Sequence, residues 1–345
     1  MTTSPVKLGI VSFAHHHAGF YMSSLSARTD VELVATDPHG HEATVGRESR
    51  GRAQAEKFGV DYMETYDDLL AWGPDAVMVC SENARHVTDV IAAAEAGAHV
   101  LVEKPMATTI EDAERMIDAC DRAGVALMVS YPIRFTPMYG ALREAVRRGD
   151  IGAVMSATGT NNGKLPMGGA GWFTDPSLSG GGALMDLVVH LADLLDDLLD
   201  GAHASTVYAA SNRVLHGANS LVNVETGGLV TITYPGGQIA TIDCSWSEPE
   251  KSPSWGGLTL EVVGTRGVAE IDPFAPRVGG FNDALGTEFW LSYGVDSTVP
   301  LIDEFLTAIR QGRAPRPDGR TGLRSLAIAE AAQRSAESGQ AIRLD

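Results

Sequence analysis

The sequence predicts a doubly wound, parallel α/β domain followed by an α+β domain, whose open and mainly antiparallel sheet is covered by helices on one face. Three observations support this prediction. The chain has 345 residues, a length that favours two domains. Its first part alternates between short apolar runs and segments of helical periodicity, whereas later segments are rich in β-branched residues. We place the boundary so that the domains are 1–128 and 129–345.

Five apolar runs in the first domain have the length and composition of buried parallel strands. They are Val6–Ser12, Val31–Thr36, Ala76–Cys80, His99–Val102 and Ala126–Ser130. Segments with helical spacing lie between them, at Gly19–Arg28, Gly51–Phe58, Tyr66–Trp72, His86–Ala96 and Ile110–Ala123. Gly59, Gly97 and Gly124 follow three of these segments, where a left-handed C-cap favours glycine. Thr109, with Asp112 three residues later, is typical of a helix N-terminus. Strands that alternate with helices predict a parallel sheet with helices on both faces.

The second domain combines helices with a sheet. Its helical segments are Ala141–Arg148, Asp186–Leu199, Val299–Gln311 and Gly322–Ser338. Between Thr206 and Ile271 the chain consists of β-branched runs separated by turn residues, and we interpret Gly227-Gly228 and Gly236-Gly237 as hairpin turns. Successive strands joined by tight turns predict an antiparallel sheet.

Composition and charge exclude several classes of protein. Acidic residues number 44 against 26 basic ones, and the formal net charge of −18 repels nucleic acid backbones. Apolar residues make up 44% of the chain, so disorder is not its main feature. The chain shows no apolar run of about 18 residues and no signal-peptide pattern. The widely spaced Cys80, Cys120 and Cys244 are interpreted as buried thiols of a reducing compartment. We expect a cytoplasmic protein that binds neither nucleic acid nor membranes.

The loop after the first strand has the position of a dinucleotide-binding fingerprint, G-x-G-x-x-G. Its three glycine positions hold Ser12, Ala14 and His17, so the fingerprint is incomplete. Asp37, at the end of the second strand, is stronger support, because a carboxylate there accepts the ribose hydroxyls of NAD and repels the 2′-phosphate of NADP. The alternative is that Asp37 only forms a turn before Pro38. A nearby arginine (Arg47, Arg50 or Arg52) would weaken the preference for NAD.

The consecutive residues His15, His16 and His17 raise the question of a metal ion. Adjacent side chains point in different directions, and no cysteine or carboxylate lies nearby at zinc spacing. We therefore expect no metal there and interpret the histidines as a helix-entry loop with one imidazole facing the cofactor.

Two further segments carry residues suited to chemistry. Glu103-Lys104-Pro105 ends a buried strand, the place where parallel sheets bind ligands, and Pro105 permits a cis bond. Later, three glycines precede Asp186 and His190, which are four residues apart and so share a face of an otherwise apolar helix. Asp193 continues that face. A buried polar stripe is costly unless it is used or paired, so it predicts either a site or a pair that ties the helix to a neighbour.

These segments together resemble the Gfo/Idh/MocA family of oxidoreductases, named for glucose–fructose oxidoreductase, inositol dehydrogenase and a rhizopine-catabolism protein. The resemblance covers nearly the whole chain. It includes AEAGAHVLVEKPMATT, RFTPMYGALREAVRRGDIG, GWFTDPSLSGGGALMDLVVHLADLL and LIDEFLTAIRQGRAPRPDGRTGLRSLAIAEAAQRSAESG. It implies a Rossmann NAD-binding domain, an oligomeric assembly, and a catalytic group formed by Lys104, Asp186 and His190.

The chemistry of alcohol oxidation agrees with these residue types. His190 has the pKa range of a general acid/base, Asp186 would bind substrate hydroxyls or tune His190, and Lys104 would donate to the reacting oxygen. We expect cofactor contacts from Ser12, Phe13, Ala14, His15, His17, Asp37, Ser81, Asn83, His86, Glu103 and Lys104. We expect substrate contacts from Tyr131, Arg134, Asn161, Lys164 and Trp172, together with Asp186 and His190. We interpret the glycine-rich stretch that contains Asn161, Lys164 and Trp172 as irregular, and such loops commonly carry binding groups. The alternatives are ordinary packing for Trp172 and a salt bridge for Arg134.

The sequence thus predicts an NAD(P)-dependent oxidoreductase, with NAD favoured over NADP, that acts on a sugar, a polyol or a related hydroxy compound. Two alternatives keep the fold. One uses bound NAD transiently in a lyase or hydrolase reaction, and the other is a non-catalytic sensor of cofactor or sugar. The open sheet of the second domain predicts a homodimer or homotetramer.

Overall fold

The computed structural model describes residues 4–40, 50–166, 171–252, 254–284, 286–292 and 296–344. It forms two compact units. Unit 1 comprises Met1–Tyr131, Ala170–Gly180 and Thr298–Leu326, and unit 2 comprises Pro132–Gly169, Gly181–Ser297 and Ala327–Asp345. The units are interleaved along the chain, whereas the sequence suggested one division between residues 128 and 129. Each unit is described by itself.

Unit 1 contains a six-stranded parallel sheet in the order β3-β2-β1-β4-β5-β6. Its strands are β1 (Val6–Val11), β2 (Val31–Thr36), β3 (Asp61–Tyr62), β4 (Ala76–Val79), β5 (His99–Val102) and β6 (Leu127–Val129). Five of the six match the predicted apolar runs, and β3 is too short to leave a periodic signal. The strand order reverses direction beside β1 and β4, which is where doubly wound sheets bind ligands.

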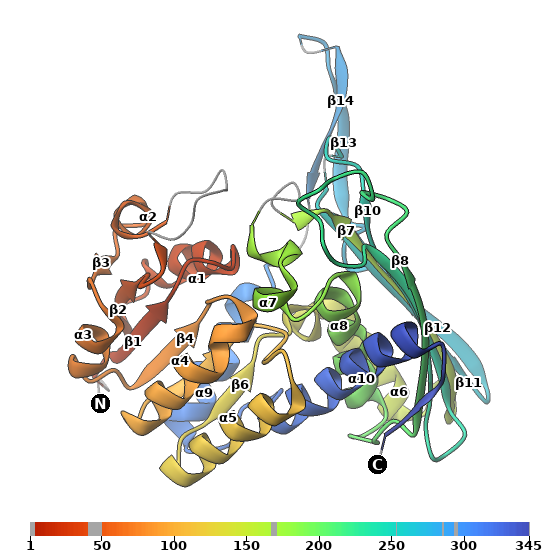
Figure 1. The fold of residues 1–345 in the computed structure, drawn as a ribbon, viewed down its shortest axis with the longest axis horizontal. Coiled ribbons are helices and arrows are strands. Elements are labelled where there is room, and N and C mark those ends of the chain that lie inside the picture. Colours follow the sequence, from red (N-terminus) through yellow and green to blue (C-terminus); the bar gives the residue numbers. More distant parts are fainter. Residues whose placement is uncertain are drawn as a thin grey trace. The chain divides into compact units, whose positions relative to one another are not determined.

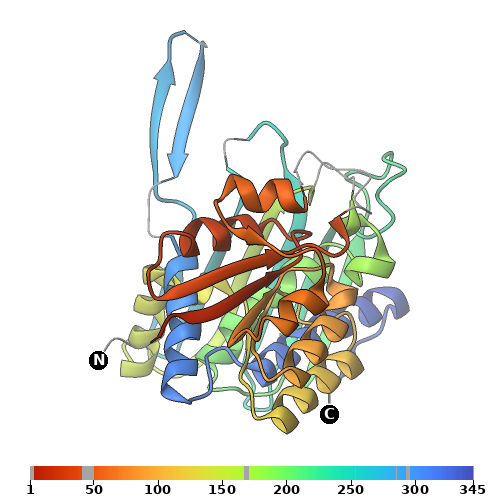
Figure 2. The same ribbon diagram turned by 90° about the vertical axis from the view of Figure 1, so that its left-hand side faces the viewer.

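Helices cover both faces of this sheet (Figures 1 and 2). The helices that lie in unit 1 are α1 (His17–Leu25), α2 (Arg52–Lys57), α3 (Tyr66–Ala71), α4 (His86–Glu95), α5 (Ile110–Ala123), α7 (Pro176–Ser179) and α9 (Thr298–Gln311). Right-handed crossovers place α1 on one face and α4 with α5 on the other, and α9 packs beside α1. The predicted caps are confirmed: Thr109 accepts a hydrogen bond from the Asp112 amide (3.1 Å), and Gly124 has a φ of 67°.

Unit 2 contains a seven-stranded sheet in the order β12-β11-β7-β10-β9-β8-β15. The strands are β7 (Val154–Lys164), β8 (Thr206–Asn212), β9 (Gly227–Thr233), β10 (Ile239–Glu248), β11 (Gly256–Gly264), β12 (Gly267–Ile271) and β15 (Ile342–Arg343). All neighbouring pairs are antiparallel except β7 and β10. The mainly antiparallel character is therefore confirmed.

Two predictions for this sheet are wrong. We interpreted the stretch around Asn161 and Lys164 as irregular, but it forms the central strand β7. The sequence of β7 lacks the usual alternation of apolar and polar residues, because the residues on its buried face are small or polar. They are Ala157, Gly159, Asn161 and Gly163. Gly227-Gly228 is not a turn, because both residues open β9 and pair with β10. Gly236-Gly237 does form the turn between β9 and β10, and Gly237 has a φ of 87°.

Helices cover one face of the unit 2 sheet, as predicted (Figure 1). These are α6 (Pro137–Arg148), α8 (Ala183–Leu198) and the end of α10 (Gly319–Ser338), which begins in unit 1. The segment Pro176–Leu198 is long and apolar enough to cross a membrane, but 83% of its apolar 18-residue window is buried inside the protein, as expected of a core helix. A separate hairpin of β13 (Arg277–Asn282) and β14 (Thr287–Ser292) projects beyond the sheet in Figures 1 and 2.

Candidate functional site

Ser12 gives the loop after β1 the shape that glycine usually provides. Its φ is 69°, in the left-handed region that costs most residues free energy. The side chain offsets this strain, because the hydroxyl donates to Asp37 Oδ1 (3.3 Å) and accepts from the Ala14 amide (3.2 Å). The incomplete fingerprint therefore retains the tight turn at its first position.

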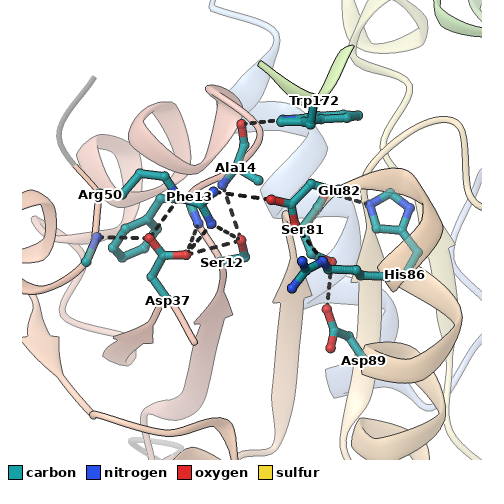
Figure 3. Close-up of polar contacts among 12 residues, drawn as sticks. Ser12, Phe13, Ala14, Asp37, Arg50, Ser81, Glu82, His86, Asp89 and Trp172 are labelled. Atoms are coloured by element: carbon teal, nitrogen blue, oxygen red, sulfur yellow. Dashed lines mark hydrogen bonds and ion pairs between the residues drawn. The ribbon is translucent and has the colours of Figure 1, made fainter. Parts of the chain in front are cut away.

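Asp37 lies at the end of β2 and is buried among five hydrogen-bond donors. The Ser12 hydroxyl, the Phe13 amide (3.2 Å) and the Gly51 amide (2.9 Å) are three of them. The other two are Nε and Nη2 of Arg50, at 3.0 Å from Oδ2 and 2.6 Å from Oδ1 (Figure 3). Arg50 also donates from Nη1 to Glu82 Oε1 (3.2 Å) and so spans the ends of β2 and β4. Sequence reasoning named Arg50 only as one of three arginines and missed Glu82.

The segment after β4 is anchored by its own side chains. The Ser81 hydroxyl donates to Asp89 Oδ2 (2.6 Å), and Asn83 Nδ2 donates to the Ser179 carbonyl (2.8 Å). The ring of His86 is fully buried, with Nε2 3.0 Å from the Ser81 carbonyl and Nδ1 3.1 Å from the Pro105 carbonyl. His86 thus ties this segment to the backbone of Pro105, which follows the cis peptide bond after Lys104.

Glu103 is the centre of a buried polar cluster below Lys104. Its Oε1 accepts from Tyr21 Oη (2.5 Å) and lies 3.0 Å from His17 Nδ1, while its Oε2 accepts from the Lys104 amide (3.2 Å). Burial opposes ionisation of Glu103, but His17 and the hydrogen bond from Tyr21 hold its pKa well below the ordinary value. The carboxylate therefore fixes the backbone of Lys104 and the first residue of α1 together.

The three histidines gather instead of diverging, so that expectation was wrong. Their ligand nitrogens lie within 4.8 Å of one another. The rings of His15 and His16 are stacked, with centroids 4.7 Å apart and planes at 21°. The ring of His17 stands edge-on to both, with centroids 4.3 Å from His15 and 4.6 Å from His16, so the spacing of the three nitrogens is compatible with one metal ion. Burial lowers the pKa of His15 well below its usual value, so this ring packs as a neutral group.

Residues from the second half of the chain complete this part of unit 1. Trp172 is buried and its Nε1 donates to the Ala14 carbonyl (3.0 Å, Figure 3). Its ring stacks on Phe173. The segment that contains Trp172 therefore holds the cofactor loop, and the indole packs rather than presenting an open face.

Buried polar atoms at the ends of β1, β2 and β4 are suited to bind a polar ligand. Among the described residues, buried atoms there without a hydrogen-bond partner include His15 Nε2, Thr36 Oγ1 and Asn83 Oδ1. Such atoms are rare in proteins unless a ligand or water satisfies them. Together with the Asp37 carboxylate and the N-terminus of α1, they suit the hydroxyls and pyrophosphate of a dinucleotide.

In unit 2, Asp186 lies in the first turn of α8 and His190 one turn further along. The indole Nε1 of the fully buried Trp246 donates to Asp186 Oδ2 (3.0 Å). Trp246 is itself fixed through its backbone, by the Thr226 carbonyl and by His216 Nε2 (both 2.8 Å). Sequence reasoning missed Trp246, which lies 60 residues from Asp186 and has no local signal.

Gly182, just before α8, allows the backbone of Glu225 to approach the N-terminus of the helix. A Cβ at Gly182 would lie 1.9 Å from the Glu225 carbonyl oxygen, so the close approach is to backbone and not to a ligand. Glu225 Oε1 accepts from the amides of Gly182 (2.9 Å) and Leu184 (3.0 Å), which otherwise lack partners at a helix N-terminus.

The structure places three predicted substrate residues of unit 2 in other contacts. Arg134 forms a two-pronged ion pair with Asp193 (2.6 and 3.0 Å), and burial raises the pKa of Asp193 to about 6 against the opposing effect of Arg134. Asn161 Nδ2 donates to the Leu187 carbonyl, and Lys164 Nζ donates to the Ser252 carbonyl. The fourth predicted residue outside α8 and Trp172 is Tyr131, which is buried at the end of unit 1.

Comparison with known proteins identifies both units. Residues 8–131 match a family model described as an oxidoreductase family with an NAD-binding Rossmann fold, and residues 139–270 match the GFO/IDH/MocA C-terminal domain. The 1,5-anhydro-D-fructose reductase of Ensifer adhaerens is 30% identical over 86% of this chain and 88% of its own length. The D-glucoside 3-dehydrogenase of Escherichia coli is 36% identical, over 56% of this chain and 54% of its own.

The crystal structure of GenD2 from gentamicin A biosynthesis, in complex with NAD, has the same fold. Its TM-score is 0.87 at 24% identity, over 100% of this chain and 98% of that one. The family models cover most of the chain, and their order along it agrees with the resemblance drawn from the sequence motifs. This chain belongs to the Gfo/Idh/MocA family of NAD-binding oxidoreductases.

Proposed function

We propose that this protein interconverts a hydroxyl group and a carbonyl group on a sugar, a polyol or a related compound. The observation that carries the proposal is the pair Asp186 and His190, one turn apart on α8, with the Asp186 carboxylate oriented by the Trp246 indole. The relatives support the substrate class, since they include a 1,5-anhydro-D-fructose reductase and a myo-inositol 2-dehydrogenase.

The residues of unit 1 are suited to hold the cofactor. Asp37 would take the adenosine ribose, the loop from Ser12 to His17 would take the pyrophosphate, and Asn83 and Lys104 would approach the nicotinamide end. When bound, NAD supplies the site that accepts or returns the hydride.

The chain's own residues would handle the proton. His190 is proposed as the general base that removes the hydroxyl proton in oxidation and returns it in reduction. Asp186 would orient the substrate hydroxyl or His190, and the Lys104 ammonium would stabilise negative charge on the reacting oxygen. We propose that catalysis requires Lys104 from unit 1 together with Asp186 and His190 from unit 2.

The experiment is a panel of polyols, aldoses and inositols with NAD, followed by absorbance of the reduced nicotinamide. We expect Lys104→Ala, Asp186→Asn and His190→Asn each to lower kcat/KM on the active substrate by roughly 10²–10⁴-fold. The matched controls, Asp200→Asn and His203→Asn, change exposed residues beyond the end of α8 and should retain activity. Retained activity in the first three variants would refute the assignment. Turnover of substrate without net NADH would favour transient use of the cofactor.

We also propose that the protein is a homodimer or homotetramer in the cytoplasm. The open face of the unit 2 sheet exposes apolar side chains at Tyr208, Leu229, Ile239 and Val268. Cys80, Cys120 and Cys244 are free and buried, which suits a reducing compartment. Fractionation of the source cells tests the location.

A further inference from the structure

Asp37, the carboxylate that would bind the cofactor's ribose, already accepts as many hydrogen bonds as its oxygens can hold. Asp37 accepts five hydrogen bonds, of which three come from its own surroundings: the Ser12 hydroxyl and the amides of Phe13 and Gly51. A carboxylate offers about four lone-pair positions. Two ribose hydroxyls can therefore bind Asp37 only if the two N–H groups of Arg50 leave it.

Arg50 donates to Asp37 in the same pattern as the two hydroxyls of a vicinal diol would. Nε donates to Oδ2 and Nη2 donates to Oδ1, one donor to each carboxylate oxygen. The 2′- and 3′-hydroxyls of a ribose would do the same. Arg50 thus occupies the positions in which the adenosine ribose of NAD would be recognised, as Figure 3 shows for its side chain between Asp37 and Glu82.

Arg50 also changes the charge of this end of the site. A lone carboxylate rejects the 2′-phosphate of NADP by charge repulsion. Here two carboxylates, Asp37 and Glu82, face one guanidinium, and Arg85 Nε lies 3.4 Å from Glu82 Oε2. The cluster is neutral in total. Asp37 keeps its three inner donors when Arg50 turns away, while Glu82 still holds Nη1.

We propose that Arg50 is the residue that sets cofactor specificity and that it makes the site accept NADP as well as NAD. With NAD, Arg50 leaves Asp37 to the ribose diol and remains on Glu82. With NADP, the released Nε and Nη2 donate to the 2′-phosphate. This inference rests on the proposed cofactor role of Asp37 and deepens it.

Isothermal titration calorimetry with two probes that lack nicotinamide tests the proposal without a known substrate. The probes are ADP-ribose and ADP-ribose carrying a 2′-phosphate on its adenosine. The wild type should bind the two with dissociation constants within about tenfold of each other. Arg50→Gln should weaken binding of the phosphorylated probe by about 30-fold or more, as expected for a lost charged hydrogen-bonding partner. ADP-ribose should bind the variant as tightly as the wild type or more tightly, because its hydroxyls no longer have to displace Arg50 from Asp37.

Two further variants test whether the effect is specific to the position and the geometry of Arg50. Arg52→Gln removes the same charge two residues away, from an exposed arginine that pairs with Glu64, and should leave the ratio of the two affinities unchanged. Arg50→Lys keeps the charge without the two-pronged geometry and should give an intermediate ratio. Thermal unfolding of each variant confirms that it is folded.

The outcomes separate the two proposals. Equal weakening of both probes by Arg50→Gln, or no change in either, would overturn the role of Arg50 while leaving the cofactor site in place. A wild type that binds only ADP-ribose would overturn it as well. A wild type that binds neither probe would refute the cofactor site itself and the inference with it.

Discussion

At the scale of single residues, unusual side chains in unit 1 replace the glycines of a dinucleotide loop. Ser12 adopts a positive φ and its hydroxyl satisfies the neighbouring Asp37 and Ala14. His17 stands at the third glycine position, and its ring contacts the buried Glu103 instead of blocking the loop. The glycine fingerprint does not match Ser12 or His17, because each residue is accommodated by a partner elsewhere in the chain, Asp37 for Ser12 and Glu103 for His17.

Asp89 provides a pH-dependent prediction at the same scale. Burial raises its pKa to about 6, although the hydrogen bond from Ser81 opposes the shift. A carboxyl whose pKa is higher in the folded state binds more protons folded than unfolded, so its contribution to stability falls as pH rises from about 4 to about 6. Above that range the buried charge is destabilising.

We therefore expect Asp89→Asn to raise the free energy of unfolding at pH 7.5 by about 1–3 kcal/mol and to change it little at pH 4. Chemical denaturation of both proteins across this pH range is the measurement. Asp118→Asn, at an exposed position of α5, removes the same charge and serves as the control. A variant that is less stable than the wild type at pH 7.5 would contradict the prediction.

At the scale of elements, the start of α8 depends on a residue far along the chain. Glu225 satisfies two amides of the first turn, and its backbone carbonyl accepts from the Ala183 amide (3.0 Å). A negative side chain at a helix N-terminus also interacts favourably with the helix dipole. Glu225 therefore positions the turn that carries Asp186.

Glu225→Ala should lower stability by about 1–2 kcal/mol, in the range for loss of an N-terminal cap, and should also lower kcat because the first turn of α8 loosens. Glu225→Gln keeps an acceptor and should cost less. The comparison is Thr109→Ala, which removes the cap of α5 and should cost similar stability without the fall in kcat. If Glu225→Ala unfolds at the same denaturant concentration as the wild type, the capping role is wrong.

At the scale of the whole molecule, the uncovered face of the unit 2 sheet exposes apolar side chains, and we propose that a second copy covers it. Leu229 on β9 is 62% exposed and Val268 on β12 is 58% exposed, while Gly228, Val230 and Ile232, which alternate with Leu229 along β9, are buried. Exposed apolar side chains on a sheet face are commonly buried between subunits.

Leu229→Lys should therefore shift the protein toward monomers in sedimentation at micromolar concentration, because it places a charge in an apolar interface. The folded chain should keep its stability, since the side chain is exposed in the single copy. Val299→Lys, an exposed apolar position of α9 in unit 1, is the control. A wild type that sediments as a monomer would refute the assembly.

Elements with a local and periodic signal could be predicted from the amino-acid sequence. These are the apolar runs of β1, β2, β4, β5 and β6, the cap at Thr109 and the spacing of Asp186 and His190 on one helix face. The contacts between distant side chains became visible in the folded chain alone. Arg50 on Asp37, Trp246 on Asp186 and Glu225 on α8 join residues 13 to 60 positions apart, and the polar strand β7 becomes central only through its neighbours. Such pairings follow from chain packing, which leaves no repeating pattern along the sequence.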